Sequence, residues 1–218
     1  MFEGFSPRTI DFMWNIRFNN NKAWFTEHKS EYQSDFLLPM KELGAALYER
    51  INGQYPEHGL MLKVSRIYRD ARRLRPGDGP YKENLWLSLE KPSEEGDSTV
   101  AFWFDLSPEG WSYGMGYYSA RAATMAKFRE RLEENPQEFE KLVAPIMEQG
   151  EFVLGGEEYA RKKPAPTEGT QAWYNKKSFY FEHRQENGEE LFSPDFANRL
   201  AEGYILLMPL YDYLIAID

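Results

Sequence analysis

The fold is decided by two strand-forming segments and the turn that joins them: Thr99-Val100-Ala101-Phe102-Trp103-Phe104-Asp105-Leu106, Ser107-Pro108-Glu109-Gly110 and Trp111-Ser112-Tyr113-Gly114-Met115-Gly116-Tyr117. Aromatic and β-branched residues favour strands on both sides, and proline and glycine mark the turn. Two earlier segments, Leu60 to Tyr68 and Asn84 to Glu90, alternate between apolar and polar residues, as half-buried strands do. Four strands joined by turns predict an antiparallel meander rather than a βαβ arrangement.

The strand signals continue outside this stretch. Ser178 to Glu186 predicts a further strand that places Phe179, Phe181 and His183 on one face. Glu95-Gly96-Asp97 predicts the turn that precedes Thr99.

Helix signals stand before and after the strands. Ser6-Pro7 combines a capping residue with proline at the first helical position, and Ser119 and Asn135 are the expected caps of two later helices. Pro39 falls inside an expected helix, where proline removes a hydrogen bond, so we expect a kink or break near Leu38. The expected helices cover residues 7–18, 22–51, 120–133 and 136–149, and a final helix opens at Ser193-Pro194.

These signals together predict the α+β class. We expect a central antiparallel sheet of about four to six strands, with helices at both ends of the chain packed on it. The length of 218 residues and the hydrophobic content of 42% suit one sizeable core. We therefore expect a single globular domain over residues 1–218.

Charge and cysteine content limit the classes of function. The chain has 26 basic and 35 acidic residues and a net charge of −9, which disfavours nucleic acid and anionic membranes as partners. It has no cysteine, which excludes disulfides, thiol nucleophiles and thiolate metal sites. The start of the chain lacks signal-peptide features, and the longest apolar run, Tyr204 to Ile217, is shorter than the roughly 20 residues of a spanning helix. We expect a cytoplasmic protein that does not contact a membrane.

Positive charge gathers in one segment between the first two strands, Arg66-Ile67-Tyr68-Arg69-Asp70-Ala71-Arg72-Arg73-Leu74-Arg75-Pro76-Gly77-Asp78-Gly79-Pro80-Tyr81-Lys82. We call residues 66–82 the arginine loop. Clustered guanidinium groups repel one another unless anions lie close by. Those anions are either the chain's own carboxylates, such as Asp70 and Asp78, or a ligand. Exposed ion pairs contribute only about 0–1 kcal/mol each, so stability alone explains the cluster poorly.

Two other polar segments carry weaker signals. Asn19-Asn20-Asn21 before Trp24-Phe25 predicts helix caps followed by core aromatics, and the functional alternative is an asparagine that reaches the arginine loop. Basic residues alternate with aromatics in Arg161-Lys162-Lys163-Pro164 and Trp173-Tyr174-Asn175-Lys176-Lys177, a pattern that can follow a nucleic-acid backbone. The acidic net charge favours a solvated surface for these residues instead.

No motif in the chain identifies a reaction. The three histidines, His28, His58 and His183, lack metal-ligand spacing, so we predict no metal site, and no cofactor is indicated. No serine lies in a Gly-x-Ser-x-Gly context, and Gly114-Met115-Gly116 lacks the third glycine of a dinucleotide fingerprint. The sequence therefore leaves open whether the protein is an enzyme.

Several segments together resemble domain-of-unknown-function family 2461, a group of conserved hypothetical proteins. They follow one another as Phe2-x-Gly4-Phe5, Asn19-Asn20 before Trp24-Phe25, Arg66-Ile67-Tyr68-Arg69-Asp70-x-Arg72, Pro80-Tyr81-Lys82-x-Asn84, a stretch from Gly155 to Lys163, and Lys177-x-Phe179. The resemblance covers nearly the whole chain and implies one domain in which these segments converge. It implies no particular reaction.

The chain departs from the family pattern at the tip of the arginine loop. The resemblance implies an aromatic residue where Arg73 stands, a basic residue where Asp78 stands, and a turn that is one residue shorter. It therefore favours other residues of the loop as the candidates for ligand binding, namely Arg66, Arg69, Arg72, Tyr81 and Lys82.

Our hypothesis is a cleft that binds a small anionic ligand bearing a phosphate or a carboxylate. Basic side chains would frame the cleft, Tyr68 or Tyr81 would supply a hydroxyl, and Asp70 would hold an arginine in its rotamer. If the site does chemistry, we expect transfer or hydrolysis of a phosphoryl or carboxyl compound, assisted by arginine charge. The alternatives are a protein-interaction module whose basic loop docks on an acidic partner, and a purely structural cluster. The predicted ligand-binding residues are Arg66, Tyr68, Arg69, Asp70, Arg72, Tyr81 and Lys82.

Overall fold

The protein, seen in a computed structural model that describes residues 1–92 and 99–217, contains a six-stranded antiparallel sheet. The strand order across the sheet is β1-β2-β3-β4-β6-β5, so the first four strands are neighbours in chain order. This confirms the predicted meander and the α+β class. The strands are β1 (Met61–Val64), β2 (Leu85–Glu90), β3 (Val100–Leu106), β4 (Gly110–Tyr117), β5 (Val153–Gly155) and β6 (Tyr180–Glu186).

Helices precede and follow the meander. A π-helical segment, Tyr32–Leu37, leads directly into α4, and a 3₁₀ turn, Ala71–Arg73, lies in the arginine loop. The α-helices are α1 (Pro7–Phe18), α2 (Lys22–Glu27), α3 (Lys29–Glu31), α4 (Leu38–Gln54), α5 (Ala122–Glu134), α6 (Pro136–Gln149), α7 (Gln171–Tyr174) and α8 (Phe196–Ile215).

Several boundaries differ from those that the sequence predicts. The expected kink or break near Leu38 is confirmed, because the π-helical segment ends at Leu37 and α4 begins at Leu38. The helix expected over residues 22–51 is also interrupted at His28, which the sequence did not predict. Pro39 is the second residue of α4 and has no N–H to donate, and the carbonyl oxygen of Asp35, four residues earlier, accepts from the Thr9 hydroxyl at 2.6 Å. Arg121, not Ser119, is the N-cap of α5.

Short elements were the hardest to predict. β5 has three residues and α7 has four, which is too few for a periodic pattern, and neither was expected. β1 ends at Val64 rather than at Tyr68, which forms an isolated bridge with Tyr81. The turn expected at Glu95-Gly96-Asp97 lies outside the described residues.

The chain divides into two compact units. The first comprises Met1–Leu89, Trp103–Ser112 and Arg184–Ala201, and the second comprises Glu90–Phe102, Tyr113–His183 and Glu202–Asp218. Strands β2, β3, β4 and β6 contribute residues to both units. The single domain over residues 1–218 stays a prediction.

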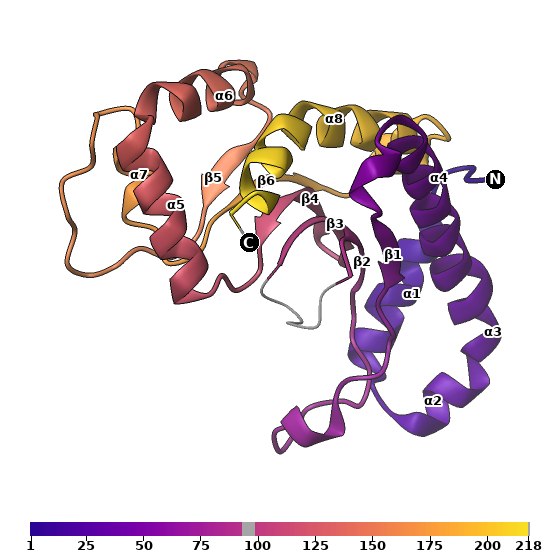
Figure 1. Ribbon diagram of the computed structural model, residues 1–218. Coiled ribbons are helices and arrows are strands. Elements are labelled where there is room, and N and C mark those ends of the chain that lie inside the picture. Colours follow the sequence, from indigo (N-terminus) through magenta and orange to yellow (C-terminus); the bar gives the residue numbers. More distant parts are fainter. Residues whose placement is uncertain (93–98, 218) are drawn as a thin grey trace. The chain divides into compact units, whose positions relative to one another are not determined.

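In the first unit, helices pack beside the strands that carry the arginine loop. Figure 1 draws α1 to α4 in indigo and purple next to β1 and β2. Gly44 of α4 permits this approach, because a Cβ there would lie 2.9 Å from a methyl carbon of Leu62 and 3.4 Å from one of Leu87. Phe196 packs edge-on against Trp111 with ring centroids 4.9 Å apart.

In the second unit, aromatic rings from α5, α6 and β6 form the core. Phe128 of α5 packs 5.4 Å from Phe139 of α6 and 5.0 Å from Phe179 beside β6, measured between ring centroids. Arg131 of α5 donates to the carbonyl oxygen of Tyr213 at 3.0 Å, near the end of α8. A cation placed there satisfies one of the last helical carbonyls and opposes the negative end of the helix dipole.

Among residues 1–92 and 99–217, no helix combines the length and the apolar character that crossing a membrane requires.

We expect two glycine substitutions in the second unit to differ in cost. Gly150 has φ +71°, and the space that a Cβ would occupy there is open, so Gly150→Ala should cost only the left-handed strain of about 1–2 kcal/mol. Gly156 has φ +113°, and a Cβ there would lie 2.0 Å from the carbonyl oxygen of Ser178. Gly156→Ala should therefore lower the free energy of unfolding by clearly more, as measured in urea. Equal costs would contradict the close backbone approach between Gly156 and Ser178.

Candidate functional site

The arginine loop rises from a short two-stranded base in the first unit. The N–H of Arg69 donates to the carbonyl oxygen of Pro80 at 2.9 Å, and the N–H of Lys82 donates to that of Ile67 at 2.7 Å. Ile67 is fully buried, whereas Arg66 and Tyr68 on either side of it are exposed. The alternation that the sequence predicts at Arg66 and Tyr68 therefore continues beyond the end of β1.

Asn20 fastens the base of this loop to the segment between α1 and α2. Its side-chain Nδ2 donates to the carbonyl oxygen of Tyr81 at 3.0 Å, and its Oδ1 accepts from the N–H of Tyr81 at 3.0 Å. Gly79 leaves room for this side chain, because a Cβ there would lie 2.1 Å from the Asn20 Cγ. The neighbouring Asn21 caps α2 by accepting from the N–H of Trp24 at 3.0 Å.

Both contacts that the asparagine run suggested are present, each made by a different residue. Asn21 is the predicted helix cap, and Asn20 makes the contact with the arginine loop that the functional alternative required. The prediction of two core aromatics is correct for Phe25, which is buried, but not for Trp24, which is partly exposed.

The two tyrosines of the arginine loop, Tyr68 and Tyr81, differ in exposure. Tyr81 is 4% exposed and stacks on Phe25 with ring centroids 4.1 Å apart, while Tyr68 is 54% exposed. Burial, together with the nearby Tyr68, raises the pKa of Tyr81, and burial raises the pKa of Tyr32 to about 12. The hydroxyls of Tyr81 and Tyr32 stay protonated at neutral pH. Tyr68 is the tyrosine of the three that solvent reaches most easily.

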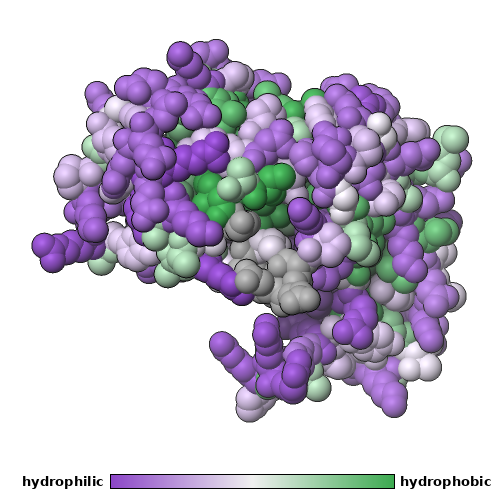
Figure 2. Space-filling model, viewed as in Figure 1, coloured by the Kyte–Doolittle hydropathy of each residue, from purple (hydrophilic) through white to green (hydrophobic). Residues whose placement is uncertain are grey.

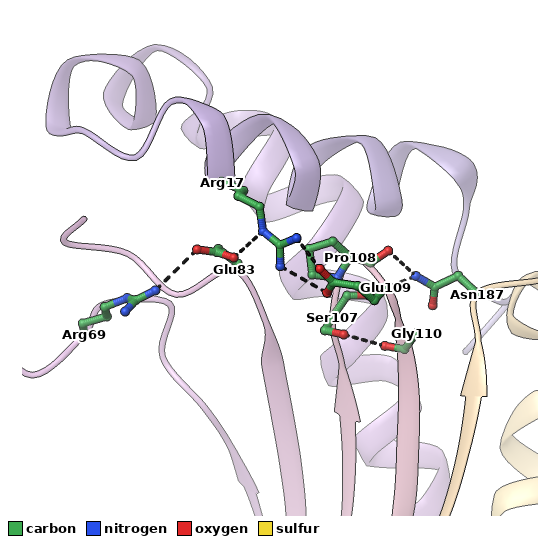
Figure 3. A network of polar contacts seen from close by, with 8 residues as sticks. All are labelled: Arg17, Arg69, Glu83, Ser107, Pro108, Glu109, Gly110 and Asn187. Atoms are coloured by element: carbon green, nitrogen blue, oxygen red, sulfur yellow. Dashed lines mark hydrogen bonds and ion pairs between the residues drawn. The ribbon is translucent and has the colours of Figure 1, made fainter. Parts of the chain in front are cut away.

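A carboxylate lies between two arginines beside the loop (Figure 3). Arg17, at the end of α1, donates from Nε to Glu83 at 2.5 Å and from both Nη atoms to Glu109, one of these at 3.1 Å. The hydrogen bonds from Arg17 lower the pKa of Glu109. On the opposite side, Arg69 Nη2 lies 3.5 Å from the second oxygen of Glu83. All three nitrogens of the Arg17 guanidinium are therefore engaged by the chain itself.

The turn that carries Glu109 is itself held by hydrogen bonds. Ser107 Oγ donates to the carbonyl oxygen of Gly110 at 2.9 Å, and Asn187 Nδ2 donates to that of Pro108 at 2.9 Å (Figure 3). The predicted β3–β4 turn thus positions a carboxylate as well as joining two strands.

Arg69 differs from Arg17 because most of its guanidinium is unused. Its Nε donates to the carbonyl oxygen of Tyr81 at 2.7 Å, which holds the side chain in place. The 3.5 Å separation from Glu83 is longer than a normal N–H···O hydrogen bond. Within the described residues, neither Nη atom donates a hydrogen bond, and the side chain is 35% exposed.

Lys82 and Arg66 form a second group of cations. Lys82 Nζ lies 5.7 Å from the centroid of the Trp86 ring. Its pKa is lowered by partial burial and then by the charges of Arg66 and Arg69, with Asp105 opposing the effect. In the part of the chain that the structure describes, neither Lys82 nor Arg66 forms an ion pair. This group therefore holds two positive charges without an ion pair among the described residues, and the charge of Asp105 offsets that of Lys82 only in part.

The remaining arginines of the loop, Arg72, Arg73 and Arg75, are exposed. Asp70 accepts from Arg72 Nε at 3.0 Å and from Arg72 Nη2 at 2.7 Å, so Asp70 holds the rotamer of Arg72. The Arg72 side chain is 88% exposed. Arg73 and Arg75 are exposed, and no described residue pairs with either side chain.

An open cleft of about 360 Å³ lies between the loop and the end of α1. Figure 2 shows mostly hydrophilic residues where Figure 1 places the arginine loop. Of the predicted ligand-binding residues, only Arg69 lines this cleft. The lining consists of Arg17, Asn20, Arg69, Gly77, Asp78, Gly79 and Glu83.

Sequence reasoning missed Arg17 and Glu83 as members of the site. Neither stands in a recognisable motif, and their pairing depends on a contact between α1 and the start of β2. The contact between Asn20 and the arginine loop was only an alternative interpretation of the asparagine run, beside helix capping. Gly77 and Gly79 of the arginine loop both line the cleft.

The basic segment that contains Trp173 and Tyr174 lies in the second unit. Trp173 and Tyr174 are buried, as are Asn175 and Lys176, so the aromatics of this segment do not offer a stacking surface.

Over residues 1–92 and 99–217, no group of three histidine, aspartate or glutamate side chains is arranged to hold a metal ion.

A comparison with protein families decides the relationship that the motifs suggested. The sequence profile of DUF2461, described as a conserved hypothetical protein family, matches residues 8–213. The chain belongs to the DUF2461 family. The match covers nearly the whole of this DUF2461 protein and confirms the predicted resemblance. No curated protein matches the chain.

We expect Asn20→Ala to loosen the base of the arginine loop. The change removes both side-chain hydrogen bonds to Tyr81 and should lower the free energy of unfolding by about 1–3 kcal/mol. Amide hydrogen exchange at Tyr81 should also become faster. Asn21→Ala is the matched control, since it removes only a helix cap worth about 1 kcal/mol and should leave exchange at Tyr81 unchanged. Unchanged protection of Tyr81 in Asn20→Ala would contradict this account.

We expect Asp70 to titrate at an unusually low pH. Hydrogen bonds from the Arg72 side chain and backbone lower the pKa of Asp70 from 3.8 to about 2. Because the folded pKa is depressed, the pair favours the folded state above the ordinary pKa, and this effect is lost as the pH falls through about 2. In Arg72→Met, NMR titration of the Asp70 carboxyl should give a pKa closer to 3.8. The same low value in both proteins would show that Arg72 is not the cause.

Proposed function

We propose that this DUF2461 protein binds a small anionic ligand, bearing a phosphate or a carboxylate, in the cleft beside the arginine loop. The observation that carries the proposal is the state of Arg69. Its Nε is anchored on the carbonyl oxygen of Tyr81, while its two Nη atoms donate no hydrogen bond within the described residues. A guanidinium held at one end and open at the other is ready to receive an oxyanion through two parallel hydrogen bonds.

The charges around Arg69 support the same proposal. Lys82 and Arg66 lack ion-pair partners in the described chain, and the pKa of Lys82 is lowered by its burial and by the charges of Arg66 and Arg69. An anion near Arg69 would reduce this repulsion and favour the charged form of Lys82. Arg66 and Lys82 are thus proposed to raise the local positive potential, and Tyr68 to offer an accessible hydroxyl.

The proposal gives smaller roles to two residues that the sequence favoured. Arg72 is turned toward Asp70 and away from the cleft lining, so we propose that this pair shapes the loop. Transfer or hydrolysis of a phosphoryl or carboxyl compound stays a prediction, because no nucleophile has been assigned. A cytoplasmic location likewise stays a prediction from the sequence.

A second candidate function is favoured by the tip of the loop. Arg73 and Arg75 are exposed and have no side-chain partner among the described residues, as expected if an acidic segment of another protein docks there. Binding of a poly-glutamate peptide that disappears in an Arg73→Met, Arg75→Met double variant would support this module.

We expect Arg69→Met to abolish anion binding at the cleft. Wild-type protein at low salt should be stabilised by phosphate or by a small carboxylate, by about 2.7 kcal/mol at a hundred times the dissociation constant. A thermal-shift titration measures the effect, and in Arg69→Met it should vanish. The basal stability should fall by only about 1 kcal/mol, because Glu83 keeps its pair with Arg17.

Arg73→Met is the matched control, because it removes an arginine of the same loop that does not line the cleft. It should bind the anions as wild type does. Equal loss in both variants would indicate a general charge effect, and the absence of any stabilisation in wild type would overturn the proposal.

A further inference from the structure

We propose that the ligand of this cleft is a small zwitterion that carries both a carboxylate and an ammonium group. The inference rests on the proposed anion site and specifies its ligand further. It comes from the balance of charges in the lining, which contains two arginines, Arg17 and Arg69, and two acidic residues, Asp78 and Glu83. Two carboxylates in the lining would repel a ligand that carries only negative charge.

The lining arginines are not equally available. Arg17 is occupied by Glu83 and Glu109 through all three of its nitrogens, so its charge is already compensated. Arg69 is therefore the lining arginine whose two Nη atoms donate no hydrogen bond within the described residues. One available guanidinium suits one carboxylate, whereas a phosphate dianion would bring a second negative charge close to Asp78 and Glu83.

The backbone offers further donors for the carboxylate end of the ligand. Gly77 and Gly79 line the cleft, and in the described part of the chain their N–H groups donate to no acceptor. Gly77 has φ +95°, and no heavy atom lies within 4 Å of the position that a Cβ would take, so its backbone is open on that side. Free N–H groups next to a guanidinium form a good environment for a carboxylate.

Asp78 provides the complementary group for the ammonium end. One of its oxygens, Oδ2, accepts from the N–H of Arg75 at 2.8 Å and so keeps the turn closed. Asp78 makes no ion pair in the described chain, which leaves Oδ1 able to accept from an ammonium group. Glu83 is less suited to this role, because Arg17 and Arg69 approach its two oxygens.

The size and polarity of the cleft limit the ligand to a small molecule. Its volume of about 360 Å³ lies near the lower end of the roughly 300–1,000 Å³ of ordinary ligand sites. Its lining has no aliphatic or aromatic side chain, so an extended apolar group would gain little there. An α-amino acid with a short side chain has the required charges and dimensions.

The test compares four probes by isothermal titration calorimetry at low salt and pH 7.5: L-alanine, propionate, propylamine and inorganic phosphate. L-Alanine should bind at least about tenfold more tightly than propionate or propylamine, because only it uses both ends of the cleft. Arg69→Met should abolish binding of both L-alanine and propionate.

The decisive variant is Asp78→Asn. Its amide oxygen can still accept from the N–H of Arg75, so the turn is kept while the negative charge is lost. Affinity for L-alanine should fall about tenfold, and affinity for propionate should stay the same or rise. Asp11→Asn, which removes an exposed carboxylate from α1 outside the cleft lining, is the matched control and should change neither affinity.

The outcomes separate this inference from the anion proposal. If propionate or phosphate binds as tightly as L-alanine and depends on Arg69, or if Asp78→Asn leaves L-alanine binding unchanged, the zwitterion inference is overturned and the anion site stands. If none of the four probes binds wild-type protein, both are overturned.

Discussion

Asn20 connects the two parts of the chain that form the cleft, and the candidate site depends on that connection. Its amide side chain pairs with both the N–H and the carbonyl of Tyr81, as a neighbouring strand would. The carbonyl oxygen of Tyr81 also accepts from Arg69 Nε. The backbone of Tyr81 therefore binds the side chain of Asn20 and also holds Arg69, the predicted arginine that lines the cleft. Gly79 is needed beside it, because any side chain there would displace Asn20.

The charges of the arginine loop fall into three groups with different physical situations. Arg69 shares Glu83 with Arg17, in a partly exposed network where removing one partner leaves another in place. Arg72 is neutralised locally by Asp70. Arg66 and Lys82 form no ion pair with a described carboxylate, although the charge of Asp105 partly offsets that of Lys82. Because a loop stabilised only by its own ion pairs has no need of cations outside those pairs, this third group favours a ligand over a purely structural role.

The sequence located the candidate site better than it identified its members. The high density of arginine in residues 66–82 is apparent from the sequence alone, and one of these arginines, Arg69, lines the cleft. No local pattern identifies Arg17, Asn20 or Glu83 as members of the candidate site, because each makes its contact with a residue that is distant in the chain. Asp70 and Arg72 were predicted to take part in the site, but they satisfy each other across two positions of the loop. Local pairing of this kind competes with a ligand, and a residue pattern alone does not show which of the two prevails.

The sequence by itself determined the α+β class, the four-strand meander, the limits of α1 and α6, and the family. Those features depend on local signals: alternation along a strand, proline and capping residues at helix ends, and glycine in turns. Tertiary structure decided the interruption of the expected helix at His28, how β5 and α7 form, and which arginine has Nη atoms that donate no hydrogen bond within the described residues. These outcomes depend on hydrogen bonds and ion pairs between distant segments, such as Asn20 with Tyr81 and Arg17 with Glu83. Such contacts exist only once the chain is folded, and no local pattern encodes their geometry.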